Sequence, residues 1–437
     1  MRAIKIQYFL SFAVIGALLP YLPVYLSKER GLSDGQIGMA LGAWHVGGLL
    51  TPVLMTLMAD LRVSPRKLMA VAYLMSGVAL TVVLVVDSMV GVVVVLILQS
   101  VALCPIFALQ DGLCFSVLHR HVQSAPTTTL GYQHLRIWGT IGFIVPCLGI
   151  PLLLAEPGAT GRNCDTSVCV MLSALVCLLG MINCATLPEP EQPAPVGDPA
   201  DAGRSPDNRA SEGSDTAPAV PARTMLPTTA AIRQLVRPNM LVFIVGSAMM
   251  TMSITAFYAF FPLLLTGELM LPARHVGPIV SLGVAVEVFF VLGLSPLRRR
   301  MGLAGVMLFG AVAHAVRCAV LAVLRVPLLA IGVQVLHGPT VLTVHIAPPV
   351  YVNDHAQPWF RSSMQGIYQV LMGLARISGV VITGVAAQWS MTHAFWLITA
   401  MSVGASVMYL LLCWMRHTAG GGGQPPQRTQ RGCDAAS

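Results

Sequence analysis

Charged residues are scarce in this chain of 437 residues. Asp, Glu, Lys and Arg together make up 10% of it, whereas hydrophobic residues make up 55%. Soluble domains carry about 25% charged residues, so the composition excludes a pair of ordinary soluble domains. Polar stretches are correspondingly rare, and only the segment from 188 to 238 is too long and polar to lie within a membrane.

The chain also lacks the patterns typical of enzymes and metalloproteins. Its ten cysteines show no metal-ligand spacing, and most lie in hydrophobic segments where they pack as small apolar residues. We find no paired catalytic motif and no His-x4-Asp pattern, so we expect no enzyme, cofactor or bound metal. Cys164 and Cys169 share one expected outer loop. They either form a disulfide there or remain free thiols.

Long apolar segments make up most of what is present. A bilayer span requires roughly 20 apolar residues, and six such segments lie on each side of the polar stretch. The expected spans are Ile4–Leu26, Gln36–Ala59, Leu68–Val86, Val90–Leu118, Arg136–Leu154, Val168–Leu187, Met240–Leu265, Val276–Leu297, Leu303–Leu324, Leu328–Val352, Ser362–Gln388 and His393–Met415. The fold class is therefore an all-α polytopic membrane protein with twelve transmembrane helices in two six-helix bundles.

The polar segment divides the chain into two nearly equal halves. It contains ten prolines and seven acidic residues and few large apolar ones, so it cannot bury enough surface to offset its ordering entropy. We predict an N-terminal bundle at 1–187, a disordered cytoplasmic linker at 188–238, a C-terminal bundle at 239–416 and a disordered tail at 417–437. Two matched membrane halves joined by one linker are typical of rocker-type transporters.

The basic residues predict the orientation, because cytoplasmic loops retain Lys and Arg. With both termini inside, the inner loops and tails hold eighteen of these residues and the outer loops hold five. The net charge of +8 thus reflects topology and not a nucleic-acid surface. Met1–Lys5 leads directly into a full-length span, so we expect no cleavable signal peptide and a multi-pass protein of the plasma (inner) membrane.

Only two acidic residues, Asp111 and Glu287, lie deep in the expected spans. An ionisable group at that depth is costly unless it faces a partner or water. Gly283, Val284 and Val291 share the helical face of Glu287, so its charged form is disfavoured and a proton can bind there. Two interpretations remain open: Glu287 couples transport to protons, or it forms a fixed pair with Arg317. For Asp111 the expected basic partner is Arg136.

Further polar residues share helical faces. Gln365, Gln369, Arg376 and Thr383 align on the eleventh span, where they either line a cavity or lock the helix to a neighbour. Ser247, Thr251, Thr255 and Tyr258 form a similar seam on the seventh span, in which hydroxyls also serve as helix–helix contacts. Two interpretations are open for each of His314, His337 and His345: a proton shuttle, or a hydrogen-bonded core residue.

The fifth span opens with the sequence from Leu135 to Phe143. Arg136, Thr140 and Phe143 line one helical face and offer a charge, a hydroxyl and an aromatic ring, while Gly139 and Gly142 permit close helix packing on the next face. This stretch resembles the fifth-helix motif of a branch of the major facilitator superfamily. That branch includes nucleoside:proton symporters, phenylpropionate-type permeases and, more distantly, lactose permease.

The resemblance implies a set of site residues. Arg136, Thr140, Phe143 and Glu287 match positions that form the substrate and proton site of nucleoside symporters, and Thr255 and Tyr258 stand where those symporters carry amides. Lactose permease is similar in pairing an acid and an arginine, here Glu287 and Arg317, beside a histidine like His337. With the span residues above, the predicted substrate site is Arg136, Thr140, Phe143, Thr255, Tyr258, Gln369 and Arg376, and the predicted proton-coupling site is Glu287, Arg317, Asp111 and His337.

Together these features predict a secondary active transporter that is monomeric and works by alternating access. We expect it to import a small organic solute, such as a nucleoside, a sugar or an aromatic acid, together with protons. A proton-antiport exporter of the same superfamily, a transporter-like membrane sensor and a membrane-embedded enzyme remain alternatives. The sensor alternative is disfavoured because it would leave Glu287 without a role in proton coupling.

Overall fold

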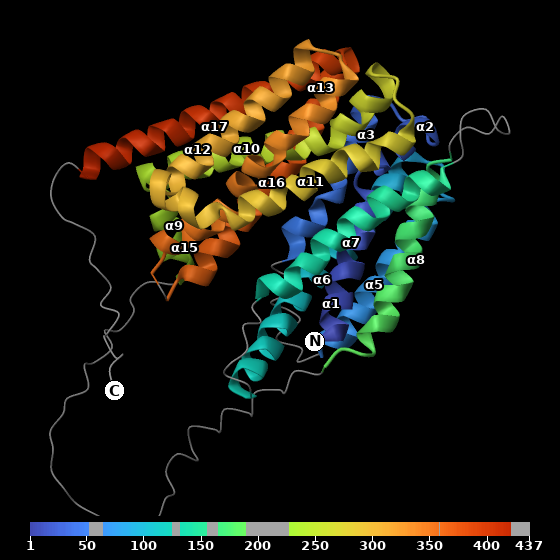
Figure 1. Cartoon of the computed structure of the whole chain (residues 1–437), viewed down its shortest axis with the longest axis horizontal. Coiled ribbons are helices and arrows are strands. Elements are labelled where there is room, and N and C mark those ends of the chain that lie inside the picture. Colours follow the sequence, from blue (N-terminus) through green and yellow to red (C-terminus); the bar gives the residue numbers. More distant parts are fainter. Residues whose placement is uncertain (52–63, 125–131, 155–164, 189–226, 358, 421–437) are drawn as a thin grey trace, which may run out of the picture.

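The computed structural model describes residues 1–51, 64–124, 132–154, 165–188, 227–357 and 359–420. Every regular element within these ranges is a helix. Residues 1–188 form one bundle, the N-terminal half, and residues 227–420 form a second bundle, the C-terminal half, which lies beside it (Figure 1). The predicted division of the membrane region into two helical bundles thus has a direct counterpart in the structure.

The helices of the N-terminal half follow the expected spans closely. They are α1 (Arg2–Leu18), α2 (Leu22–Lys28), α3 (Asp34–Trp44), α5 (Pro65–Val83), α6 (Met89–Ser124), α7 (Tyr132–Leu153) and α8 (Ser167–Cys184). Pro20 lies between α1 and α2, and together these two helices form the first span. The third and fourth spans, which almost touch in the sequence, are separate helices, α5 and α6.

The C-terminal half contains more irregular helices. Its elements are α9 (Pro227–Leu235), α10 (Pro238–Leu263), η1 (Leu264–Glu268), η2 (Ala273–His275), α11 (Val276–Leu292), α12 (Leu294–Val323), α13 (Pro327–Gly332), η3 (Val333–Leu336), α14 (His337–Val341), η4 (Leu342–Ile346), α15 (Ala347–His355), α16 (Arg361–Trp389) and α17 (Met391–Gly420). Gly302, with φ of 70°, breaks α12 between the basic Arg298–Arg300 segment and the ninth span. Only glycine adopts that conformation readily.

Eleven helices within the described residues are long and apolar enough to cross a membrane. The expected second span is missing from this set because it runs into residues 52–63, which lie outside the described part; α3 is its beginning. Large apolar side chains such as Leu152 and Phe289 are exposed on the outside of the bundles, where lipid would cover them. The chain is therefore a multi-pass membrane protein.

The tenth span is not one continuous helix. It consists of α13, the 3-10 turn η3, α14, the π-helical turn η4 and α15 in succession. Prolines at 339, 348 and 349 lack the backbone N–H that a continuous helix requires. Single π-helical turns are frequent at functional sites, and this interrupted span carries three of the polar residues considered below.

Two predicted boundaries need correction. The end of the expected linker is not disordered, because α9 occupies residues 227–235 and buries Ala230, Ala231 and Leu235 against the C-terminal half. The tail was expected to begin at 417, whereas α17 continues to Gly420. Residues 189–226 and 421–437 lie outside the described residues. Of the two cysteines expected in the outer loop, Cys164 also lies outside the described residues. The Cys169 thiol is free and buried, and it donates a hydrogen bond to the Thr166 carbonyl.

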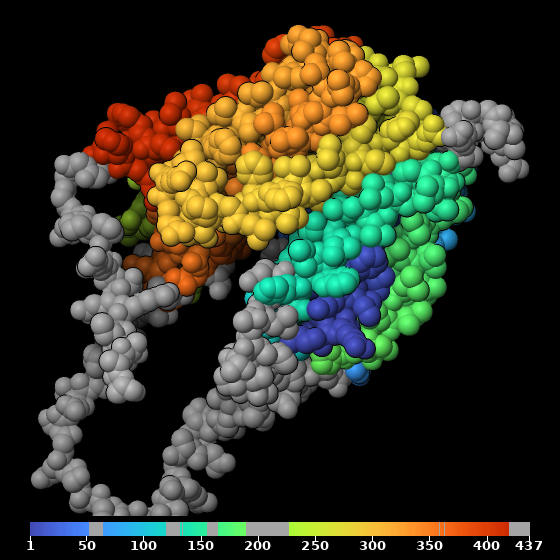
Figure 2. Space-filling view, in the orientation of Figure 1, coloured from blue at the N-terminus to red at the C-terminus, as the bar shows by residue number. Residues whose placement is uncertain are grey.

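The two halves meet at one end and diverge at the other (Figures 1 and 2). The closed end includes α2, α3 and α13, and the divergent end includes the N-terminus, α9 and α15. At the closed end α3 packs on α16 so tightly that a Cβ on Gly38 would lie 2.7 Å from Cα of Gly384. On the other side of the interface α11 packs against α7, where Gly277 meets Tyr21 and the Cys147 carbonyl.

Candidate functional site

Polar side chains from both halves face one another between the bundles. Arg136 comes from α7 of the N-terminal half, and its charge acts on Glu287 of α11 and on His345 of η4. The remaining members come from α10, α12, α14, α16 and η3. We call the whole set the central site: Arg136, Tyr258, Glu287, Arg317, Gln334, His337, His345 and Arg376. It combines seven elements of the C-terminal half with one of the N-terminal half.

Glu287 and His337 form the acid–histidine contact of the central site. The carboxylate Oε2 lies 3.9 Å from Nε2 of His337, and the Tyr258 hydroxyl lies 3.1 Å from the same nitrogen. His337 is almost fully buried, whereas 28% of the Glu287 side chain is exposed. The carboxylate is therefore the member of this contact that solvent or substrate can reach.

Arg317 is held by neutral groups. Its guanidinium lies 3.9 Å from the Phe257 ring centroid, 3.3 Å from Nδ1 of His337, and in a hydrogen bond to the Gln334 side-chain oxygen. No carboxylate of the described residues lies within ion-pair distance of it. The expected direct pair of Arg317 with Glu287 is thus absent there, and His337 stands between them.

The Arg317 contact indicates the tautomer of His337. Arginine can only donate hydrogen bonds, so Nδ1 must accept, and the ring proton of a neutral His337 lies on Nε2, toward Glu287 and Tyr258. A second proton on the ring would face the Arg317 charge. This arrangement disfavours a doubly protonated His337.

Arg136 has an aromatic partner in its own half. Its guanidinium carbon lies 4.0 Å from the ring centroid of Phe12 on α1, a cation–π contact. Thr140, one turn further along α7, is half-buried. Phe143 is buried in the apolar core of the N-terminal half, where Gly16 of α1 packs on its backbone. Of the predicted triplet, Arg136 therefore belongs to the central site and Phe143 packs in the core, while Thr140 is half-buried between them.

Asp111 is bound by tyrosines and not by arginine. Its Oδ1 accepts hydrogen bonds from the hydroxyls of Tyr8 at 2.5 Å and Tyr132 at 3.2 Å. The expected ion pair with Arg136 does not form among the described residues. Tyr8 lies on α1 and Tyr132 at the start of α7, so this network ties three helices of the N-terminal half together beside the central site.

The polar face of α16 serves two purposes. Gln365 donates to the Pro349 carbonyl of α15 at 2.8 Å and so ties the helix to its neighbour. Thr383 is fully buried, and its side chain packs. Gln369 and Arg376 are only half-buried. Arg376 lies against the N-terminal half, because its Nη1 is 3.9 Å from the position of a Cβ on Gly48.

The hydroxyl seam of α10 is mainly a packing contact. Ser247 bonds to the Tyr409 hydroxyl of α17 at 3.2 Å, and Thr251 lies 3.4 Å from the Met372 sulfur of α16. Thr255 donates to the carbonyl of Thr251 within its own helix. Of this seam only Tyr258 reaches the central site, so the predicted binding role of Thr255 has no support from its contacts.

Several residues of the site were not recognised in the sequence. Phe12 and Phe257 stack on arginines, Tyr8 and Tyr132 bind Asp111, and Gln334 binds Arg317. His314 is fully buried beside Phe257 and Cys318, which is a core position. A glutamine inside an apolar span was a usable signal for Gln334; the aromatic residues carry no such signal.

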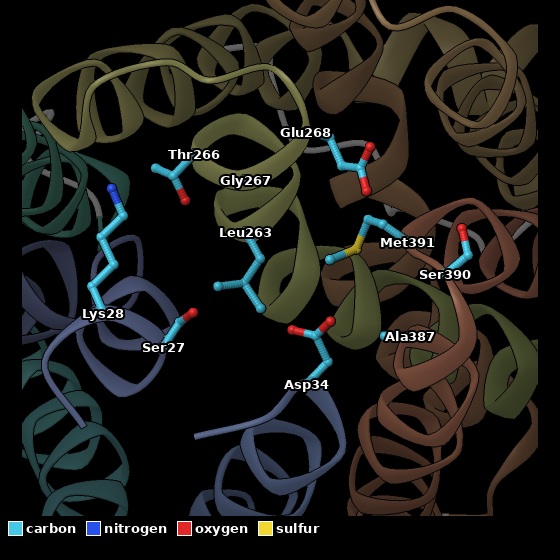
Figure 3. Close-up of a pocket in the computed structure, with 10 residues that line it drawn as sticks. All are labelled: Ser27, Lys28, Asp34, Leu263, Thr266, Gly267, Glu268, Ala387, Ser390 and Met391. Atoms are coloured by element: carbon cyan, nitrogen blue, oxygen red, sulfur yellow. The ribbon is translucent and has the colours of Figure 1, made fainter. Parts of the chain in front are cut away.

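A cavity of about 270 Å³ lies at the closed end, between the two halves (Figure 3). Lys28 and Asp34 line it from the N-terminal half, and Thr266, Glu268 and Ser390 from the C-terminal half. Burial and the nearby Glu268 carboxylate raise the pKa of Asp34, which precedes the second span. The cavity is separate from the central site, and we interpret it as part of the closure between the halves.

Comparison with known proteins identifies the family. The model of the MFS_1-like family matches residues 1–398. The chain belongs to this family. The resemblance inferred from the fifth-span motif is thereby confirmed, and so is the major facilitator fold.

Individual relatives support the same assignment. The chain is 24% identical over 388 residues to the "Putative nucleoside transporter YegT" of Escherichia coli (strain K12), which covers 86% of this chain and 82% of that protein. It is 29% identical over 143 residues to the maltose permease of Geobacillus stearothermophilus, 33% of this chain and 34% of that one. The crystal structure of the nucleoside transporter NupG aligns with a TM-score of 0.74 at 20% identity, over 94% of this chain and 98% of that one.

These relatives and structural neighbours are transporters and not enzymes. The chain is therefore a membrane transporter with a small-molecule substrate, and the expectation that it is no enzyme is confirmed by its family.

Proposed function

We propose that this protein is a proton-coupled symporter that carries a small organic solute, namely a nucleoside, a sugar or an aromatic acid, into the cell. The observation that carries the proposal is the position of Glu287. Its carboxylate faces Arg136 of the opposite half, contacts a neutral His337 and has no ion pair with Arg317 among the described residues. Such a carboxylate can gain and lose a proton as its surroundings change.

Alternating access supplies the change in surroundings. Arg136 and Glu287 lie on opposite halves, so rocking of one half against the other alters the distance between their charges. With Arg136 near, the charged carboxylate is stabilised; with Arg136 distant, protonation is favoured. Substrate that binds between Arg136 and Glu287 changes the surroundings of the carboxylate, so substrate binding and proton binding are coupled.

The orientation follows from the basic residues of the sequence. The divergent end of the bundles holds the N-terminus, α9 and α15, and the abundance of Lys and Arg in loops of that side assigns it to the cytoplasm. The structure then corresponds to an inward-facing state, with the cavity of Figure 3 at the closed outer end.

The test uses purified protein in proteoliposomes and labelled nucleosides, sugars and aromatic acids. An inward proton gradient should drive accumulation of at least one solute. Glu287→Gln imitates the protonated form in shape and neutrality, so it should abolish accumulation while it spares exchange of solute across the membrane. The matched control is Asp87→Asn, which removes a carboxylate that is 95% exposed.

The outcomes discriminate between mechanisms. Accumulation by Glu287→Gln at the wild-type level would contradict the coupling role of Glu287. Accumulation driven only by the reversed gradient would instead show a proton-antiport exporter.

A further inference from the structure

Arg376 is a charged residue at the middle of the membrane without a charged partner among the described residues. It occupies the midpoint of the span Ser363–Trp389. An arginine at that depth is retained where it faces a partner, water or a ligand, and it stays protonated there because of its high basicity. Arg376 therefore requires a negatively charged partner.

No carboxylate lies within ion-pair distance of Arg376 in the described part of the chain. The groups within reach of its charge are His45 and Cys104 of the N-terminal half and Tyr368 and His345 of the C-terminal half. The guanidinium itself lies over Gly48, the residue without a side chain at this point of the interface. Arg376 thus points at the surface of the opposite half, where the two halves separate during transport.

The other charges deep in the spans are already accounted for. Asp111 accepts hydrogen bonds from Tyr8 and Tyr132, and Glu287 contacts His337 within reach of the Arg136 charge. Arg317 is stabilised by neutral groups, namely the Phe257 ring and the side chains of His337 and Gln334. Three deep arginines therefore face two carboxylates, which leaves one positive charge unbalanced.

We infer that the transported solute carries one negative charge, a carboxylate, and that Arg376 binds it. The inference rests on the proposed transport function and narrows its substrate class to organic acids. The planar guanidinium fork matches a carboxylate with two parallel hydrogen bonds. A single negative charge balances the site, whereas a phosphate monoester carries about two at neutral pH and would leave a surplus. His345, near both Arg376 and Arg136, lies beside the bound solute.

Equilibrium binding to the purified full chain tests the inference without any proton gradient. The probes are pairs of a carboxylate and its neutral amide: 3-phenylpropionate with 3-phenylpropionamide, and uridine-5′-carboxylate with uridine-5′-carboxamide. For at least one pair the acid should bind roughly ten- to hundredfold more tightly than its neutral partner, the range expected from one or two charge-assisted hydrogen bonds.

Variants locate the effect at Arg376. Arg376→Gln should remove the preference for the acid, and Arg376→Lys should keep only part of it, because a point charge replaces the planar fork. The matched control is Arg361→Gln, which removes one positive charge from the exposed start of the same helix and should leave the preference unchanged.

The inference is overturned if no acid binds better than its neutral partner to the wild-type chain, a comparison that requires no variant. It is also overturned if Arg376→Gln or Arg376→Lys retains the full preference, or if uridine monophosphate binds better than the carboxylate. The proposed symport fails separately: acids that bind but do not accumulate in a proton gradient would refute coupling and leave the binding role of Arg376 intact. If only neutral solutes accumulate in a proton gradient, the proposed coupling stands and the binding of a carboxylate by Arg376 is refuted.

Discussion

The close contact between α3 and α16 predicts that Gly38→Ala opens the closed end of the transporter, which is the outer end in the proposed orientation. The new Cβ would lie 2.7 Å from Cα of Gly384 and 3.1 Å from the Val380 carbonyl oxygen. Carbon atoms pack favourably at about 3.5–4.0 Å, so the helices must move apart by about 1 Å. Overpacking of this kind costs about 1–3 kcal/mol.

That cost falls on the closed arrangement and not on either bundle. The two helices belong to different halves, so separation of the halves relieves the clash while each bundle stays intact. A difference of about 1–3 kcal/mol changes an equilibrium roughly 5- to 150-fold. Gly38→Ala should therefore shift the population strongly toward an arrangement in which α3 and α16 are separated.

The assay measures access to the cavity of Figure 3. Ser390, which lines this cavity, is changed to cysteine and labelled from outside with a membrane-impermeant maleimide. Gly38→Ala should accelerate labelling several-fold. The matched control is Gly366→Ala on α16, the helix against which α3 packs, where nothing lies within 4 Å of the new Cβ. Labelling at the wild-type rate in Gly38→Ala, or an equal acceleration in Gly366→Ala, would refute the reasoning.

Two further predictions concern charges of the interface. Arg136→Lys should lower the transport rate about tenfold or more at normal expression, because an ammonium cannot reproduce the planar stack on Phe12 that positions the charge toward Glu287; unchanged uptake kinetics would make Arg136 a packing residue. Burial and Glu268 raise the pKa of Asp34 in the closed state, so closure should be favoured as external pH falls and weaken as pH rises through that raised pKa. Asp34→Asn should remove this pH dependence of Ser390→Cys labelling, and its persistence would assign the effect to another group.

The number, length and order of the membrane segments were predictable from composition. Eleven of the twelve expected spans have counterparts among the described helices, because the thickness of the bilayer and the need to satisfy every backbone hydrogen bond internally determine a span locally. The error at α9 has a local cause too. Three apolar residues on one face of a short polar helix are too weak a signal until a surface is available to bury them.

The partners of the polar residues were not predictable in the same way. Asp111 and Tyr8 are separated by 103 residues and Tyr258 and His337 by 79, so their contacts depend on how the helices are rotated and packed. The expected pair of Asp111 with Arg136 was chosen by charge alone, and that of Glu287 with Arg317 by charge and by the resemblance to lactose permease. In the described residues tyrosine hydroxyls and a histidine take those places.

The sequence by itself determined that this protein lives in a membrane, that it has two similar halves, and which charged residues lie deep enough to require an explanation. Each of these properties depends on segments of about twenty residues and on the cost of placing charge in hydrocarbon. Only the tertiary structure decided that Arg317 binds neutral groups, that Arg136 faces Glu287 across the interface, and that Arg376 is left without a counter-charge in the described residues. Those facts depend on the rotation of each helix about its axis and on the contact between two halves, which no local pattern contains.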